Sequence, residues 1–132
     1  MMKLLVVDGR HARRQGIVEE LGRIVGISVQ GAVPSYSAAV HVLASYTPDI
    51  LVAGTDLGDG SALDLLAHVA TIARRPAIVV VGTGGEAQRH LDAGADRFIV
   101  LGSTFEILSD VVVAIARAAR RVIPGQSQTS NG

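Results

Sequence analysis

Short apolar runs alternate along the chain with longer segments in which apolar residues recur at a helical spacing. The runs at 4–7, 50–53, 77–81 and 98–101 are each four or five residues long, which is typical of strands buried on both faces of a sheet. Residues 27–33 alternate more between apolar and polar positions and predict a less buried strand. The pattern therefore predicts five strands.

The segments between these strands have the spacing of amphipathic helices. Serine is a good N-cap, so Ser35 and Ser61 are expected to begin two of the helices. Val25 and Ala73 are expected to lie on inward-facing helix stripes. The predicted helices cover residues 13–25, 35–46, 61–73, 86–93 and 105–122.

This order of five strand–helix units predicts an α/β fold. Strands that alternate with helices form a doubly wound parallel sheet with helices on both faces and right-handed crossovers. The strand order 2-1-3-4-5 is the common solution at this size. We expect one domain over residues 1–122, with residues 123–132 as a flexible tail or a truncated linker.

Composition limits the possible functions. The chain has 132 residues, and its 12 basic residues balance its 12 acidic residues, so the domain has no broad positive field for nucleic acid or a membrane surface. It has no cysteine for a disulfide, a zinc–thiolate site or a thiol nucleophile. The first apolar run is too short for a signal peptide or a membrane span. We expect a cytoplasmic protein.

Four segments resemble, in order, the receiver domain of bacterial response regulators. Residues 3–8 (KLLVVD) resemble its first strand and acidic pair, and residues 14–16 (RQG) resemble its first helix. Residues 48–53 (PDILVA) resemble the approach to the phosphorylation site, and residues 93–98 (AGADRF) resemble the turn and strand before the essential lysine. The resemblance implies a flavodoxin-like, CheY-like fold and a role in two-component or phosphorelay signal transduction.

The family's chemistry implies five side chains at the carboxyl ends of the strands. An aspartate accepts the phosphoryl group, two acidic residues help to hold Mg²⁺, and a hydroxyl and a lysine contact the phosphoryl oxygens. Only Asp8 of that set is present. Glycine, valine or leucine stands at the other four positions, which are Gly9, Gly54, Val81 and Leu101. We therefore expect a vestigial site, no catalytic residue and no bound Mg²⁺.

The resemblance also implies a surface for protein partners. In typical receivers the fourth helix, the fifth strand and the last helix form the face that repacks on phosphorylation and pairs two copies. The same face is expected here to contact signalling partners, including a second copy of the chain. Its candidate residues are Arg89, His90, Arg97, Phe98, Glu106 and Asp110. Direct nucleic-acid and membrane contacts are not expected.

Two alternatives remain open. Glycines gather in the loops at the carboxyl edge of the sheet, where Arg10 and Thr83 could help to bind a small anionic ligand. Asp56, two residues beyond the acceptor position, could serve as a residual phosphoacceptor. No nucleophile–base pair or metal-ligand spacing emerges among the serines and the four histidines, so an enzyme is not expected.

Overall fold

A computed structural model of the protein describes residues 1–100, 102 and 105–121. The strands are β1 (Met2–Val7), β2 (Ile27–Val33), β3 (Ile50–Gly54), β4 (Ala77–Gly82) and β5 (Arg97–Val100). The helices are α1 (His11–Leu21), α2 (Tyr36–Ser45), α3 (Ala62–Val69), the short 3-10 segment η1 (Gly84–Glu86), α4 (Ala87–Asp92) and α5 (Glu106–Arg121).

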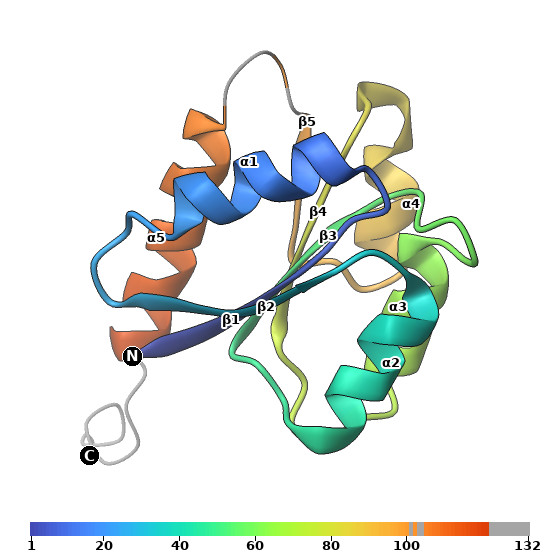
Figure 1. The fold of residues 1–132 in the computed structure, drawn as a ribbon, viewed down its shortest axis with the longest axis horizontal. Coiled ribbons are helices and arrows are strands. Elements are labelled where there is room, and N and C mark those ends of the chain that lie inside the picture. Colours follow the sequence, from blue (N-terminus) through green and yellow to red (C-terminus); the bar gives the residue numbers. More distant parts are fainter. Residues whose placement is uncertain (101, 103–104, 122–132) are drawn as a thin grey trace.

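The five strands form one parallel sheet in the order β2-β1-β3-β4-β5, as the alternation of elements predicted. Figure 1 shows α1 and α5 on one face of the sheet and α2, α3 and α4 on the other. Parallel strands bring their carboxyl ends to the same edge. The loops that follow β1, β3 and β4 therefore meet there.

Two cores lie on opposite faces of the sheet because successive strand residues point to opposite sides. In β1, Leu4 and Val6 belong to the core under α1 and α5, whereas Leu5 and Val7 belong to the core under α2 and α3. All four side chains are buried. This two-sided burial explains why the strand reads as an unbroken apolar run.

Serine caps begin two helices at the predicted positions. The Ser35 hydroxyl accepts the Ala38 N–H at 3.1 Å at the start of α2. At the start of α3, Ser61 and Asp64 form a capping box, in which each side chain accepts the other residue's backbone N–H.

The predictions for two helix ends were wrong. Val25 was expected to face inward, but α1 ends at Leu21 and the Val25 side chain is 95% exposed. Ala73 was expected on the inward stripe of α3, which instead ends at Val69, and Ala73 is exposed. In both cases the apolar spacing continues into a turn, where the helical period no longer decides which side chains are buried.

Two of the predicted features lie outside the described residues: Leu101 and the tail at 123–132. Among the helices that the structure describes, none is long and apolar enough to cross a membrane.

Candidate functional site

Asp8 is the buried acid at the carboxyl edge of the sheet. It follows β1 directly, and its side chain is fully buried. A buried carboxylate needs hydrogen-bond donors and a compensating charge. The backbone N–H of Arg10 donates to its Oδ1 at 2.9 Å, and the remaining donors come from a single side chain of α1.

That side chain is Arg13. Its Nε donates to Asp8 Oδ2 at 2.5 Å, and its Nη2 donates to Asp8 Oδ1 at 3.1 Å. The Arg13 side chain is only 20% exposed. This two-point contact between a planar guanidinium and a carboxylate is the strong, directional form of a charge-assisted hydrogen bond.

Gly54 leaves the space that the Arg13 guanidinium occupies. A Cβ atom on Gly54, at the end of β3, would lie 2.7 Å from Arg13 Nη2 and 2.9 Å from Asp8 Oδ2. Such distances are far inside van der Waals contact, so a side chain at this position requires the pair to move. Asp8, Arg13 and Gly54 therefore form one packed unit, which we call the Arg13 plug.

The start of α1 makes this arrangement unusual. Helix N-termini favour negative charge, yet the first turn of α1 has no acidic residue and contains Arg13 and Arg14. Asp8 contacts both: its carboxylate pairs with the Arg13 guanidinium, and its backbone carbonyl accepts from Arg14 Nη1 at 2.8 Å. The carboxylate at the end of β1 thus supplies the negative charge that the helix start lacks.

Two other predicted members of the vestigial site, Gly9 and Val81, lie next to members of this plug: Gly9 follows Asp8, and Val81 pairs with Gly54 in the sheet. Gly9 is exposed in the β1–α1 loop, where a Cβ atom would approach the Asp56 carbonyl oxygen to 3.0 Å. Val81, in β4, is fully buried in the core under α1 and α5. Val81 therefore places methyl groups where the resemblance implies a hydroxyl. Leu101 lies outside the described residues.

The two residues proposed to bind an anion at this edge have different surroundings. The side chain of Arg10 is exposed, and only its backbone contacts Asp8. The Thr83 hydroxyl donates to Glu86 Oε2 at 2.6 Å, and this hydrogen bond is the main cause that lowers the pKa of Glu86 below its ordinary value. Glu86 thus adds a negative charge beside Thr83, which opposes an anionic ligand there.

Asp56, the alternative phosphoacceptor, lies in the loop after β3. Its side chain is exposed, and Oδ1 accepts the Gly58 N–H at 3.0 Å in a tight turn. The nearby Asp59 instead binds the start of α2, where its carboxylate accepts from the Ser37 hydroxyl at 2.7 Å and from two backbone N–H groups. The Ser37 hydrogen bonds lower the pKa of Asp59.

The face formed by α4, β5 and α5 contains most of the predicted interface residues in exposed positions. Arg89, Arg97, Glu106 and Asp110 are exposed. The exposure predicted for His90 is wrong: it is 2% exposed, its Nδ1 lies 2.7 Å from the Glu86 carbonyl oxygen, and its ring lies 5.2 Å from that of Phe98. Phe98 is half-buried against the core under α2 and α3.

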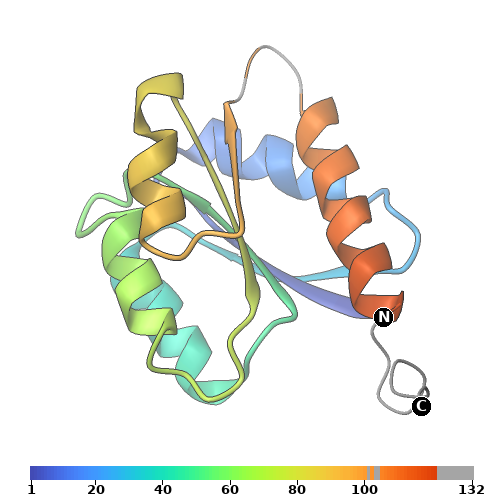
Figure 2. The same ribbon diagram turned by 180° about the vertical axis from the view of Figure 1, so that it is seen from behind.

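Each of the three elements of this face also carries an exposed apolar side chain. Leu91 in α4 is 40% exposed, Val100 in β5 is 52% exposed, and Ile107 in α5 is 61% exposed. Figure 2 shows β5 at the edge of the sheet between α4 and α5. Apolar side chains from three adjoining elements beside an open strand edge are typical of a surface that contacts another protein.

The sequence pattern missed the role of Arg13. It predicted a helix that begins at Arg13, whereas α1 begins two residues earlier at His11, so the direction of each early side chain was undetermined. The available signal was the combination of a lone acid after β1, a glycine after β3 and arginines in the next helix. Within the described part of the chain, no group of three or more metal-ligating side chains comes together.

Comparison with known proteins supports the receiver resemblance. No protein-family model matches the chain. The DNA-binding transcriptional activator DevR/DosR of Mycobacterium tuberculosis is 29% identical over 136 aligned positions, which cover 99% of this chain and 58% of that protein. The chain thus spans less than two thirds of the length of this curated relative.

Solved structures match the fold closely at low sequence identity. The response regulatory domain of MrkE from Klebsiella pneumoniae aligns with a TM-score of 0.82 and 13% identity, over 91% of this chain and 99% of that one. The receiver domain of the response regulator NarL from M. tuberculosis aligns with a TM-score of 0.78 and 18% identity, over 88% and 96%. RcsB from Salmonella enterica, bound to a promoter, aligns with a TM-score of 0.76 and 18% identity, over 88% and 60%.

These similarities agree with the strand order and with the helices on both faces of the sheet. The chain has the fold of a CheY-like receiver domain. The family resemblance seen in the four sequence segments is confirmed.

Proposed function

We propose that this chain is an atypical receiver domain that acts in two-component or phosphorelay signalling without being phosphorylated, through contacts with other proteins. The observation that carries the proposal is the Arg13 plug. Its guanidinium lies against Asp8 and over Gly54, in the space that a phosphoacceptor side chain on β3 would need.

Each requirement of phosphoryl transfer meets an obstacle at this edge. The reaction needs a nucleophilic carboxylate, and Gly54 has no side chain. It needs Mg²⁺ held by oxygen ligands, but the oxygen atoms of Asp8 already accept three hydrogen bonds. Because Arg13 neutralises Asp8, the buried carboxylate is balanced without a metal ion. We therefore expect this edge of the sheet to keep one conformation and not to change between an unphosphorylated and a phosphorylated state.

The face formed by α4, β5 and α5 is the proposed contact surface. Basic side chains lie on α4 and β5 (Arg89 and Arg97), and acidic side chains lie on α5 (Glu106 and Asp110). In the described part of the chain none of the four forms an ion pair with another residue. In a two-fold symmetric pair the same patch meets itself, so opposite charges on one face suit a homodimer.

A charge placed among the apolar side chains of this face tests the homodimer. Val100→Glu is expected to weaken dimerisation by about ten-fold or more, because it buries an unpaired carboxylate in the contact. Light scattering during size-exclusion chromatography measures the change in mass. The matched control is Ala32→Glu, which adds the same charge at an exposed position of β2, the opposite edge strand.

We expect the wild-type protein and Ala32→Glu to be dimers and Val100→Glu to be a monomer. A monomeric wild-type protein, or a Val100→Glu dimer of unchanged affinity, would rule out the homodimer on this face. The wild-type mass is also expected to be the same with and without acetyl phosphate and Mg²⁺, because the proposed contact does not depend on phosphorylation.

A further inference from the structure

A polar cavity lies at the amino edge of the sheet, opposite the Arg13 plug. It has a volume of about 240 Å³ and is formed where β1, β3 and β4 begin. Its lining includes Lys3, Thr47, Pro48, Asp49, Arg74 and Pro76. The receiver resemblance assigns no role to this place.

Backbone hydrogen bonds hold the walls of this cavity in place. The Lys3 N–H donates to Asp49 Oδ2 at 2.7 Å, and the Asp49 N–H donates to the Lys3 carbonyl at 2.8 Å. The Ala77 N–H donates to the Asp49 carbonyl at 3.0 Å. Pro48 and Pro76 stiffen the chain just before β3 and β4 begin. A ligand would therefore meet a largely pre-formed site, which lowers the entropic cost of binding.

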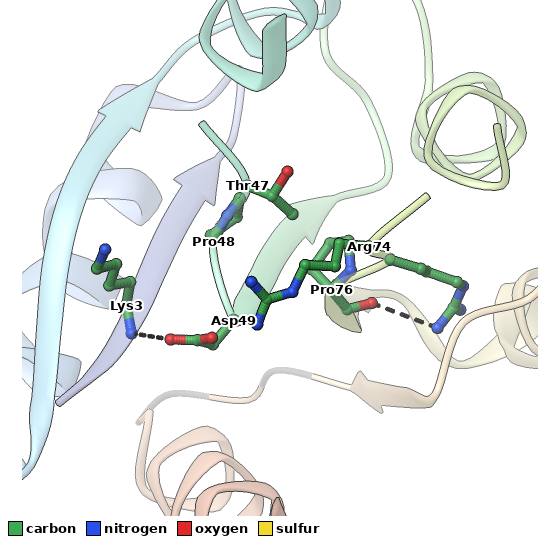
Figure 3. Close-up of a pocket in the computed structure, with 7 residues that line it drawn as sticks. Lys3, Thr47, Pro48, Asp49, Arg74 and Pro76 are labelled. Carbon is green, nitrogen blue, oxygen red and sulfur yellow. Dashed lines mark hydrogen bonds between the residues drawn. The ribbon is translucent and has the colours of Figure 1, made fainter. Parts of the chain in front are cut away.

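The cationic side chains at the cavity differ in whether they already form an ion pair with an acidic side chain. Arg75 forms an ion pair with Asp96 at 3.3 Å and donates to the Gly94 carbonyl. Lys3 and Arg74 are exposed, and within the described residues neither side chain has an acidic partner. Figure 3 shows Asp49 between them, with the Arg74 side chain reaching across toward Asp49 and Pro48.

We propose that this cavity binds a phosphoryl group, held by the Arg74 guanidinium, toward which the exposed Lys3 side chain would turn from the other side of Asp49. A guanidinium matches the paired oxygens of a phosphoryl group, and an ammonium adds a mobile point charge. The Asp49 carboxylate lies beside the site and weakens the binding of any anion, so the two cations must outweigh its charge. The Thr47 hydroxyl adds a neutral donor at the rim.

A titration of the folded protein with inorganic phosphate tests this proposal. Backbone amide NMR shifts are followed at constant ionic strength, with sodium chloride as the reference salt. We expect saturable shifts at Lys3, Thr47, Asp49 and Arg74, and none at the Arg13 plug. A parallel titration with ADP identifies the source of the group: tighter binding than phosphate indicates a nucleotide, and equal binding indicates free phosphate.

Three variants distinguish a specific phosphate site from a general attraction of phosphate to positive charge. Arg74→Gln is expected to weaken phosphate binding by about ten-fold or more, the loss typical of a charged hydrogen-bond donor. Asp49→Asn is expected to tighten binding, because the amide oxygen can still accept the Lys3 N–H while the repelling charge is gone. The matched control is Arg89→Gln, an exposed arginine on α4, which should leave the affinity unchanged.

Shifts that do not saturate, or that sodium chloride reproduces, would overturn the proposal. Equal weakening by Arg74→Gln and Arg89→Gln would also overturn it, since phosphate would then respond only to net charge. The outcome is independent of the proposed function, because acetyl phosphate labelling and dimer mass concern the opposite edge and a different face of the domain.

Discussion

Arg13→Met is expected to lower the free energy of unfolding by about 3 kcal/mol, because removing one partner of a buried ion pair leaves the other charge uncompensated. Asp8 is fully buried, and Arg13 supplies two of its three side-chain hydrogen bonds. Methionine keeps much of the apolar length of arginine, so the loss reports on the charge more than on packing. Urea unfolding, followed by circular dichroism, measures the change.

The matched control is Arg10→Met, which removes an arginine three residues away whose side chain is exposed. A surface substitution of this kind changes stability by no more than about 0.5 kcal/mol. If Arg13→Met and Arg10→Met have the same small effect, the guanidinium does not stabilise Asp8 and the Arg13 plug is not a structural unit.

Gly54→Ala is expected to cost about 1–3 kcal/mol of stability, the usual range for overpacking a closed site. The new methyl group would meet Arg13 Nη2 and Asp8 at less than 3 Å. Because Asp8 is buried, relief requires Arg13 to withdraw, so the loss includes part of the ion pair. The same urea unfolding experiment measures this change.

Gly85→Ala is the control for Gly54→Ala. A Cβ atom on Gly85 meets nothing within 4 Å, and Gly85 does not have a positive φ. Alanine there is expected to be neutral or slightly stabilising, since it restricts the unfolded chain. Combining Gly54→Ala with Arg13→Met should cost less than the sum of the two, because they disturb the same contact. Full additivity would contradict the shared site.

The sequence predicted the fold well because the strands are buried on both faces. Each apolar run in the middle of the sheet marks a strand to within two residues, and glycine, proline or serine marks most of the connections. The pattern failed where burial depends on a turn. Val25 continues the apolar spacing of α1, but the helix has already ended and the side chain points into solvent.

The candidate site was only partly predictable for a related reason. The sequence showed that Asp8 lacks its usual acidic and lysine neighbours, and that arginines follow it. It could not show which arginine side chain contacts Asp8, since that depends on the residue at which α1 begins. The prediction that His90 is exposed was also wrong. Its ring packs on Phe98, and a ring nitrogen lies within hydrogen-bond distance of a backbone carbonyl.

Intact mass spectrometry after incubation with acetyl phosphate and Mg²⁺ tests the central claim most directly. A phosphorylation-independent receiver is expected to keep its mass unchanged, because Gly54 offers no nucleophile and Arg13 fills the space above it. A stoichiometric adduct of one phosphoryl group would contradict the account. Loss of that adduct in Asp56→Asn would then assign the acceptor to Asp56, in the exposed loop after β3.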